Sequence, residues 1–218
     1  MHKTIKNLLN IENKVKQKLN ENENFKIPRI IAVSKTFKID YIKPLIQHGH
    51  CDFGENKVQE ALEKWSLVKK ENNKIKLHLI GKLQTNKAKF AVNLFDYIHS
   101  LDNEKLANKI SKLQNEYNVK NKLFIQVNIG NEDQKSGILE NHLLDFYNYC
   151  KELGLNIVGL MCIPPIGDSS IYFKKLNDLN HKLGLKELSM GMSSDYLNAI
   201  DNGSTFLRIG SEIFGSRS

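Results

Sequence analysis

Short apolar runs alternate with longer amphipathic stretches along almost the whole of this chain of 218 residues. A continuous apolar run suits a strand that is buried on both faces, as strands are in parallel sheets. An amphipathic stretch with apolar residues three and four apart is typical of a helix that covers such a sheet. We therefore expect eight strands, at residues 29–34, 51–54, 77–80, 97–99, 122–127, 156–161, 187–189 and 205–209.

The stretches between these runs predict a helix after each strand. They cover residues 39–48, 56–70, 86–95, 103–117, 139–153, 169–183 and 195–201, with a short last helix after residue 209 and a further helix at 5–19. Strands that alternate with helices imply a parallel sheet with crossover helices. The predicted fold is α/β, a single (β/α)8 TIM-type barrel with an extra N-terminal helix. We expect residues 1–27 to form a helix that packs on the barrel, and residues 28–218 to form the barrel. An open doubly wound sheet is less favoured, because no GxGxxG or Walker-type loop follows the first strand.

The composition excludes several classes of protein. The 40% apolar and 26% charged content is that of a soluble globular protein, and no apolar run approaches the roughly 18 residues of a membrane span. The start of the chain has no secretory pattern, and three cysteines that lie far apart favour the reducing cytoplasm. The net charge is +8, but only three of the 32 basic residues are arginines, the usual readers of nucleic acid. We interpret the charge as a lysine-rich solvated surface; an RNA-binding module remains a rival hypothesis, which strong salt dependence would reveal.

In a barrel of this kind, function is found where the strands end at their carboxyl side. The loops after the seventh and eighth strands contain Gly191, Ser193, Gly210 and Ser211, and each loop leads into a helix. Glycines would let backbone N–H groups approach an anion, and serine hydroxyls would add donors. The pattern predicts a phosphate site. The alternative is that these residues are ordinary helix caps beside turn glycines.

Two basic residues complete the predicted site. Lys35 directly follows the first apolar run, where a strand end would point it into the barrel mouth, and a desolvated lysine is an amine nucleophile. Arg208 ends the eighth strand at the same side of the barrel. A lysine opposite a phosphate site, with an arginine between, suggests a phosphorylated aromatic aldehyde as cofactor. The alternatives are a lysine that extends to solvent and an arginine in a structural ion pair.

Other candidates carry less chemistry. His78 lies between Leu77 and Leu79, so a hydrogen-bonded core histidine is as good a reading as a base. Asp52 and Glu55 bracket the second strand, but their spacing does not identify a carboxylate pair for catalysis. We predict no metal site, because the histidines, cysteines and acidic residues show no metal-ligand spacing.

The chain resembles the family of pyridoxal 5′-phosphate (PLP) homeostasis proteins. The matching stretches follow in family order from about residue 28 onward: AVSKTF at 32–37, FGENKVQEAL at 53–62, HLIGKLQTNK at 78–87, HSLD at 99–102, QVNIGNEDQKSGI at 126–138, GLMCIPP at 159–165, LSMGMSSDYLNAIDNGST at 188–205 and RIGSEIFGSR at 208–217. Two positions depart from the family pattern: Lys57, where an aromatic residue is common, and Ser211, where threonine is common.

The resemblance implies a PLP-binding barrel of the alanine-racemase type (PLP fold type III), without the second β domain of that enzyme. It identifies Lys35 as the Schiff-base lysine that holds PLP as an internal aldimine. It implies phosphate contacts from Ser193, Gly210 and Ser211, with Met192 offering backbone, and it places Arg208 near the pyridine nitrogen and Asn56 in the cofactor pocket. Because an arginine keeps its proton, the nitrogen that faces it stays unprotonated, which weakens the ring as an electron sink.

The resemblance therefore predicts a cytoplasmic carrier or buffer of PLP with no catalytic residue. The chain ends at Ser218, and we expect no second domain to supply the opposite acid/base of a racemase. The rival is a small PLP-dependent amino-acid racemase that uses a residue such as His78 as the second base. The expected partners are PLP and, as recipients, apo forms of PLP-dependent enzymes; we expect no membrane, no specific nucleic acid, and a monomer or weak dimer.

Overall fold

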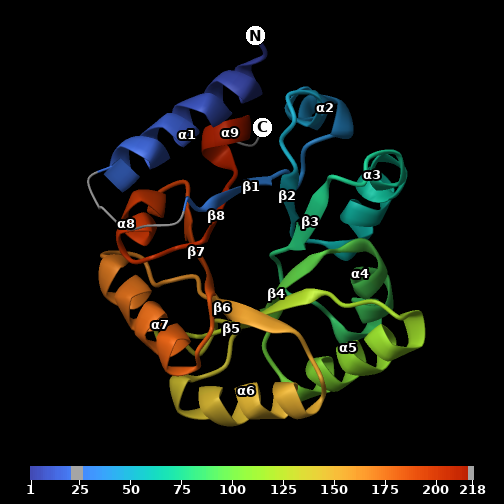
Figure 1. Ribbon diagram of the computed structural model, residues 1–218, viewed down its shortest axis with the longest axis vertical. Helices are drawn as coiled ribbons and strands as arrows, with labels where there is room; N and C mark the ends of the chain where they lie inside the picture. Colours follow the sequence, from blue (N-terminus) through green and yellow to red (C-terminus); the bar gives the residue numbers. More distant parts are fainter. Residues whose placement is uncertain (21–26, 216–218) are drawn as a thin grey trace.

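Eight parallel strands pair in chain order, and the last pairs with the first, so the sheet closes into a barrel (Figure 1). The computed structural model describes residues 1–20 and 27–215. The predicted (β/α)8 fold is confirmed. The strands are β1 (Arg29–Val33), β2 (Asp52–Glu55), β3 (Lys76–Leu79), β4 (Tyr97–Leu101), β5 (Lys122–Gln126), β6 (Ile157–Met161), β7 (Glu187–Met192) and β8 (Phe206–Ile209).

The helices form an outer ring around this barrel (Figure 1). They are α1 (Lys3–Asn20), α2 (Ile39–Gln47), α3 (Val58–Glu71), α4 (Ala88–Leu94), α5 (Glu104–Tyr117), α6 (Leu143–Glu152), α7 (Ser170–Lys182), α8 (Tyr196–Asp201) and α9 (Ser211–Phe214). Two of them are preceded by a single 3-10 turn, at Thr85–Lys87 before α4 and at Glu140–His142 before α6. The helices predicted at 86–95 and 139–153 therefore each begin in 3-10 geometry, the tighter helix that often opens an α-helix.

The seventh strand is longer than the sequence predicts. The expected strand ends at residue 189, but β7 continues to Met192. Its pairing with β8 shifts register between Ser189 and Met192, which is the mark of a bulge. The glycine at 191, which reads as the start of a loop, thus lies inside a strand, as glycines at bulges do.

Side chains of the strands alternate between two separate apolar cores. The inner core fills the barrel with Ile31, Val33, Tyr97, Phe124, Met161 and Phe206. The outer core lies between the strands and the helices, and it includes Ala32 of the same first strand. Because successive residues of a strand face opposite sides, residues 31, 33 and 35 share the inner side of the barrel. This phase decides which side chains reach the barrel mouth.

The N-terminal helix packs against the first helix of the barrel and against its last two helices. Helix α1 contacts α9, α8 and α2, and it buries Thr4, Leu8, Ile11 and Val15 on one face. Figure 1 shows α1 crossing beside the short last helix α9. The predicted segment 1–27 includes residues 21–26, which lie outside the described residues. Among the helices of the described residues, none is long and apolar enough to cross a membrane.

Candidate functional site

A pocket of about 550 Å³ opens at the carboxyl ends of the strands. All seven residues that the sequence predicts for the cofactor site line it: Lys35, Asn56, Met192, Ser193, Arg208, Gly210 and Ser211. Six further residues complete the described lining: Val33, Phe37, Ile80, Ile163, Ser194 and Gly215. The structure therefore brings together residues from both ends of the sequence at the edge where barrel function is expected.

Lys35 reaches this pocket because of the strand that precedes it. Ile31 and Val33 face the inside of the barrel, and Lys35 continues their alternation two residues beyond. The next residue, Thr36, has a φ of 71°, in the left-handed region that non-glycine residues rarely adopt. Its backbone N–H donates to Glu60 of α3, so a hydrogen bond supports this unusual turn.

A buried cluster of charges lies behind the Lys35 turn. Lys64 of α3 donates to the backbone oxygen of Ser34 and to the carboxylates of Glu55 and Glu60, each at 2.9 Å. Glu55 Oε1 also accepts from the Ser34 hydroxyl at 2.7 Å and from the Trp65 indole at 2.9 Å. The side chains of Lys64 and Glu55 are 8% and 0% exposed. We call these residues the Lys64 cluster. It holds the residues on both sides of Lys35.

Sequence reasoning selects Glu55 but does not predict its bonds to Lys64 and Ser34, and it does not select Lys64. Glu55 ends β2 with its side chain turned toward α3, so it does not face Asp52 at the other end of that strand. Among the described residues, its Oε2 is buried without a hydrogen-bond partner. A signal for Lys64 existed in the sequence, since Glu60 and Lys64 are four residues apart on one helix, the spacing of an ion pair.

The ends of β7 and β8 supply small polar groups to the opposite side of the pocket. The Met192 backbone N–H donates to the Asp195 carboxylate at 2.6 Å, and this bond closes the loop that presents Ser193. Ser193 Oγ in turn lies 3.5 Å from the backbone N–H of Glu212, in the helix that Ser211 begins. This contact links the loop that carries Ser193 to the start of α9, where Ser211 lies.

Gly191 has a different role from the one predicted. It is absent from the described lining of the pocket, and its φ is 90°. A Cβ at this position would lie 2.6 Å from the Ala199 Cβ of α8. The absence of a side chain at Gly191 therefore permits close packing of β7 against α8. Gly210 does line the pocket, as expected.

Arg208 lies on the floor of the pocket and is 4% exposed. Its Nη1 donates to Ser189 Oγ at 2.7 Å and its Nη2 to the Cys162 backbone oxygen at 2.8 Å. Both partners are neutral. Burial lowers the pKa of the Arg208 guanidinium, but an arginine keeps its proton in a protein. Burial also raises the pKa of the adjacent Cys162 thiol to about 12, so that sulfur stays protonated.

His78 lies in the barrel core and is absent from the described lining of the pocket. Its ring is fully buried, bonds to Asp52 and His99 at 3.0 Å each, and stacks on Tyr97 with ring centroids 4.4 Å apart. Burial lowers the pKa of His78 despite the Asp52 carboxylate. The structure thus agrees with the reading of a hydrogen-bonded core histidine.

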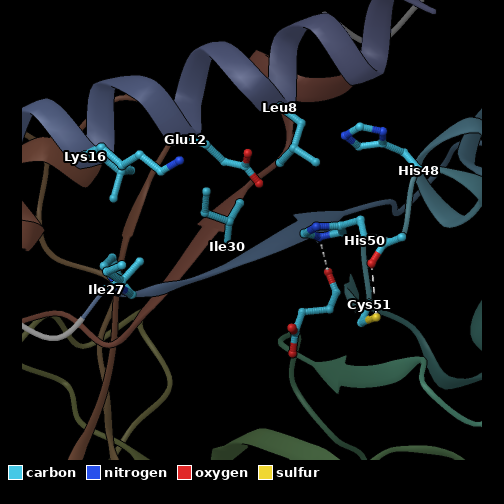
Figure 2. Close-up of a pocket in the computed structure, with 12 residues that line it drawn as sticks. Leu8, Glu12, Lys16, Ile27, Ile30, His48, His50 and Cys51 are labelled. Atoms are coloured by element: carbon cyan, nitrogen blue, oxygen red, sulfur yellow. Dashed lines mark hydrogen bonds between the residues drawn. The ribbon is translucent and has the colours of Figure 1, made fainter.

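A second cavity, of about 470 Å³, lies at the amino ends of β1 and β2. Figure 2 shows Leu8, Glu12 and Lys16 of α1 pointing toward Ile30 and toward the loop that carries His48, His50 and Cys51. The sequence gives no sign of this cavity. In these barrels the amino side of the strands serves stability, so the carboxyl-side pocket is the better candidate site. The described residues contain no group of three or more metal-ligating side chains.

Known proteins that are similar to this chain all point to one family. The family model described as "Alanine racemase, N-terminal domain" matches residues 10–218. The chain is 38% identical to the pyridoxal phosphate homeostasis protein of Aquifex aeolicus over 200 residues, 87% of each chain. It is also 38% identical to the protein of that name from Mus musculus over 212 residues, which are 87% of this chain and 77% of the mouse protein.

Solved structures show the same barrel. PipY of Synechococcus elongatus, solved with PLP bound, is 32% identical, with a TM-score of 0.81 over 92% of this chain and 100% of PipY. Alanine racemase of Clostridium difficile is 13% identical, with a TM-score of 0.70 over 93% of this chain and 56% of the racemase. This second likeness concerns the fold alone.

Proposed function

The chain belongs to the pyridoxal phosphate homeostasis protein family, and from that premise we propose that it binds PLP in the pocket at the carboxyl ends of the strands. One observation carries the proposal: Lys35, Arg208 and the two serine-bearing loops, which are far apart in the sequence, line one pocket. PipY, a relative of this chain, has been solved with PLP bound.

The described residues of the pocket fit the three chemical parts of PLP. Its volume of about 550 Å³ is within the usual range for small-molecule sites. Two of its described lining residues are basic and none is acidic, which suits an anionic ligand. The apolar side chains of Val33, Ile80 and Ile163 offer walls for an aromatic ring. Ser193, Gly210 and Ser211 would receive the phosphate, with Met192 beside them and Asn56 on the ring.

Lys35 is the residue we assign to the aldehyde. Bound PLP supplies an aldehyde carbon that forms a Schiff base with a primary amine. Lys35 is the lysine of the described lining, and the Lys64 cluster holds the residues before and after it. The turn is therefore ordered before the ligand enters, which reduces the entropy that binding must overcome.

Arg208 favours holding PLP over catalysis on it. Its guanidinium donates hydrogen bonds and keeps its proton, so a pyridine nitrogen beside it would remain unprotonated. An unprotonated ring withdraws electrons poorly, and most amino-acid chemistry on PLP depends on that withdrawal. We propose that the protein carries or buffers PLP in the cytoplasm and releases it to apo-enzymes.

The proposed site is tested by chemical trapping. Purified protein mixed with PLP should absorb in the visible region, and borohydride followed by peptide mapping should place the label on Lys35. Lys35→Ala should abolish the label, and Lys82→Ala is the matched control from the neighbouring loop. A label on Lys82 or Lys87 would overturn the assignment.

A small amino-acid racemase is the second candidate, favoured by the match to the alanine racemase N-terminal domain. Racemisation needs an acid/base on each face of the substrate carbon, and His78, our candidate for the second group, lies in the core. Exchange of the substrate α-hydrogen in deuterated water separates the two functions. A carrier should show background exchange and should pass PLP to an apo-enzyme; turnover near the usual enzyme median of about 10 per second would instead establish a racemase.

A further inference from the structure

A chain of hydrogen bonds crosses the interior of the barrel. It starts at Asp52, at the amino end of β2, whose Oδ1 lies 3.0 Å from His78 Nε2. His78 Nδ1 lies 3.0 Å from His99 Nε2, and His99 Nδ1 lies 2.8 Å from Ser189 Oγ. Ser189 Oγ lies 2.7 Å from Nη1 of Arg208, on the floor of the pocket. We call these five residues the relay.

The two end groups decide the direction of every bond in the relay. The Arg208 guanidinium only donates, so Ser189 Oγ accepts a hydrogen bond from it. The Ser189 hydroxyl then donates a hydrogen bond to His99 Nδ1. His99 then carries its proton on Nε2 and donates to His78 Nδ1. His78 likewise carries its proton on Nε2 and donates to the Asp52 carboxylate, which only accepts. As neutral rings, both histidines are therefore in the same tautomer, with the proton on Nε2.

Burial and stacking keep these groups in place. His78, His99 and Ser189 are fully buried. Burial lowers the pKa of His78 and lowers that of His99 well below its usual value, so both rings remain neutral. Burial opposes ionisation of Asp52, but the bond from His78 and the charge of Arg29 outweigh it and lower the pKa of its carboxyl. His99 also stacks on Phe124, with ring centroids 4.3 Å apart.

We propose that Asp52, His78, His99 and Ser189 are positioning residues that hold the Arg208 guanidinium in the pocket through one directed relay. Ser189 is essential to it, because its hydroxyl is the acceptor for Nη1 and the donor to His99. The proposal rests on the proposed function in one respect, that the pocket presents Arg208 to PLP. Asp52 also lines the cavity beneath α1, so the relay joins the two cavities of the barrel.

The first test uses the protein without PLP. Nitrogen-15 NMR of histidine should show two buried neutral rings, both with the proton on Nε2 and both with Nδ1 accepting a hydrogen bond. Ser189→Ala should move the Nδ1 resonance of His99 to the position of an acceptor without a donor. Ser204→Ala is the matched control: this serine is 4% exposed and donates to the Met190 backbone oxygen, outside the relay.

The second test measures PLP affinity by titration. Ser189→Ala should weaken PLP binding roughly 2-fold to 30-fold, because it acts on the ligand through Arg208 and not by direct contact. Ser189→Thr, which keeps the hydroxyl, should restore most of this loss, and Ser204→Ala should leave the affinity near that of the wild type. Asp52→Ala tests the far end: it should shift the His99 resonances and weaken PLP binding roughly 2-fold to 30-fold.

The outcomes separate the relay from the proposed function. A wild-type protein with both histidines in the expected tautomer but without PLP binding would refute the function and leave the relay standing. Binding of PLP together with a proton on His99 Nδ1 would refute the relay alone. Equal losses of affinity in Ser189→Ala and Ser204→Ala would also refute it. The tautomer measurement needs no variant, so the test survives if Ser189→Ala does not fold.

Discussion

The buried ion pair between Lys64 and Glu55 is best explained by its effect on the turn that carries Lys35, which it holds in place. Burying Lys64 and Glu55 requires removing both charges from water, and an apolar pair of similar size would often be as stable. The carboxylate and ammonium instead bond to Ser34, while Glu60 bonds to Thr36, on the two sides of Lys35. The pair thus orders a turn that apolar side chains would leave without hydrogen bonds.

Removing Lys64 should be costly to the fold. Lys64→Met removes the ammonium partner of the buried Glu55 side chain, and we expect the free energy of unfolding to fall by about 3–5 kcal/mol. Lys43→Met is the matched control, because Lys43 pairs with Asp40 on the exposed surface of α2, where solvent screens the pair and it contributes little to stability. Urea denaturation measures both. Equal losses in the two variants would refute a special role for the Lys64 cluster.

The serine that begins α9 should distinguish PLP from pyridoxal. Ser211→Ala removes one hydroxyl donor to a phosphate dianion, a bond worth about 1.5–3 kcal/mol. PLP affinity should therefore fall about tenfold to a hundredfold, whereas pyridoxal, which has no phosphate, should bind the variant and the wild type equally. Titration with both ligands is the measurement. A variant that loses affinity for pyridoxal as well would contradict the phosphate assignment.

Where the evidence was local, sequence reasoning selected residues that the structure brings to one pocket. Lys35, Arg208 and Ser211 each lie at or next to the end of a strand, and strand ends are visible as the close of an apolar run. Lys64 was missed because two of its three partners, Glu55 of β2 and Ser34 just after β1, lie 9 and 30 residues away in the sequence. No periodic pattern encodes such a contact; it depends on which face α3 turns toward the strands.

At the scale of elements, the strand β7 shows where pattern reading fails. Ser189-Met190-Gly191-Met192 contains a glycine that reads as a turn, yet the backbone continues as a strand through a shift in register. The space left by the missing Cβ is occupied by α8, so the reason for Gly191 becomes visible only in the packed structure. The periodic pattern was enough to predict that a strand is present here. The residue at which the strand ends depended on packing that the pattern does not show.

The N-terminal helix should be part of the folding unit. Ile11 of α1 is 2% exposed, against the outer core that the barrel helices share. Ile11→Ala should lower the free energy of unfolding by about 2–5 kcal/mol, through lost burial and the cavity left behind. The matched control is Ile171→Ala, since Ile171 of α7 is 68% exposed; that change should stay within about 0.5 kcal/mol. A loss from Ile11→Ala no larger than that of the control would show that α1 is independent of the barrel.

At the scale of the whole molecule, eight strand–helix repeats sufficed to predict a closed barrel, but the inside of the barrel remained invisible. His78 and His99 are 21 residues apart, and His99 and Ser189 are 90 apart. Of the three, only His78 stands out in the sequence, as a polar residue between Leu77 and Leu79. Only closure of the sheet brings residues of β2, β3, β4, β7 and β8 into one hydrogen-bonded chain. The polar interior is a property of the barrel as a whole.

Buried titratable groups in the barrel should limit stability on both sides of neutral pH: His78 and His99 in acid, and Cys162 in alkali. Burial lowers the pKa values of His78 and His99 in the folded protein. Below the usual histidine pKa of about 6.5, the histidines are protonated in the unfolded chain but remain neutral in the folded protein. Because the unfolded chain binds more protons, the free energy of unfolding must fall as the pH falls. His78 and His99 together contribute a slope of up to roughly 2.7 kcal/mol per pH unit. His50, whose pKa burial also lowers, adds to this slope. In alkali the sign reverses, because burial raises the pKa of Cys162 from 9.0 to about 12, and the unfolded chain loses its thiol proton first.

We therefore expect the free energy of unfolding to be greatest between about pH 7 and pH 8.5 and to decline on either side. Urea unfolding at half-unit steps from pH 5 to pH 10 measures this profile. His99→Gln removes one of the two buried imidazoles, so its slope in acid should be shallower by up to about 1.4 kcal/mol per pH unit. The same substitution at exposed His142 controls for the loss of an imidazole as such. A wild-type profile that is flat from pH 7 to pH 5 would contradict neutral, buried histidines in the barrel and, with them, the direction of the relay.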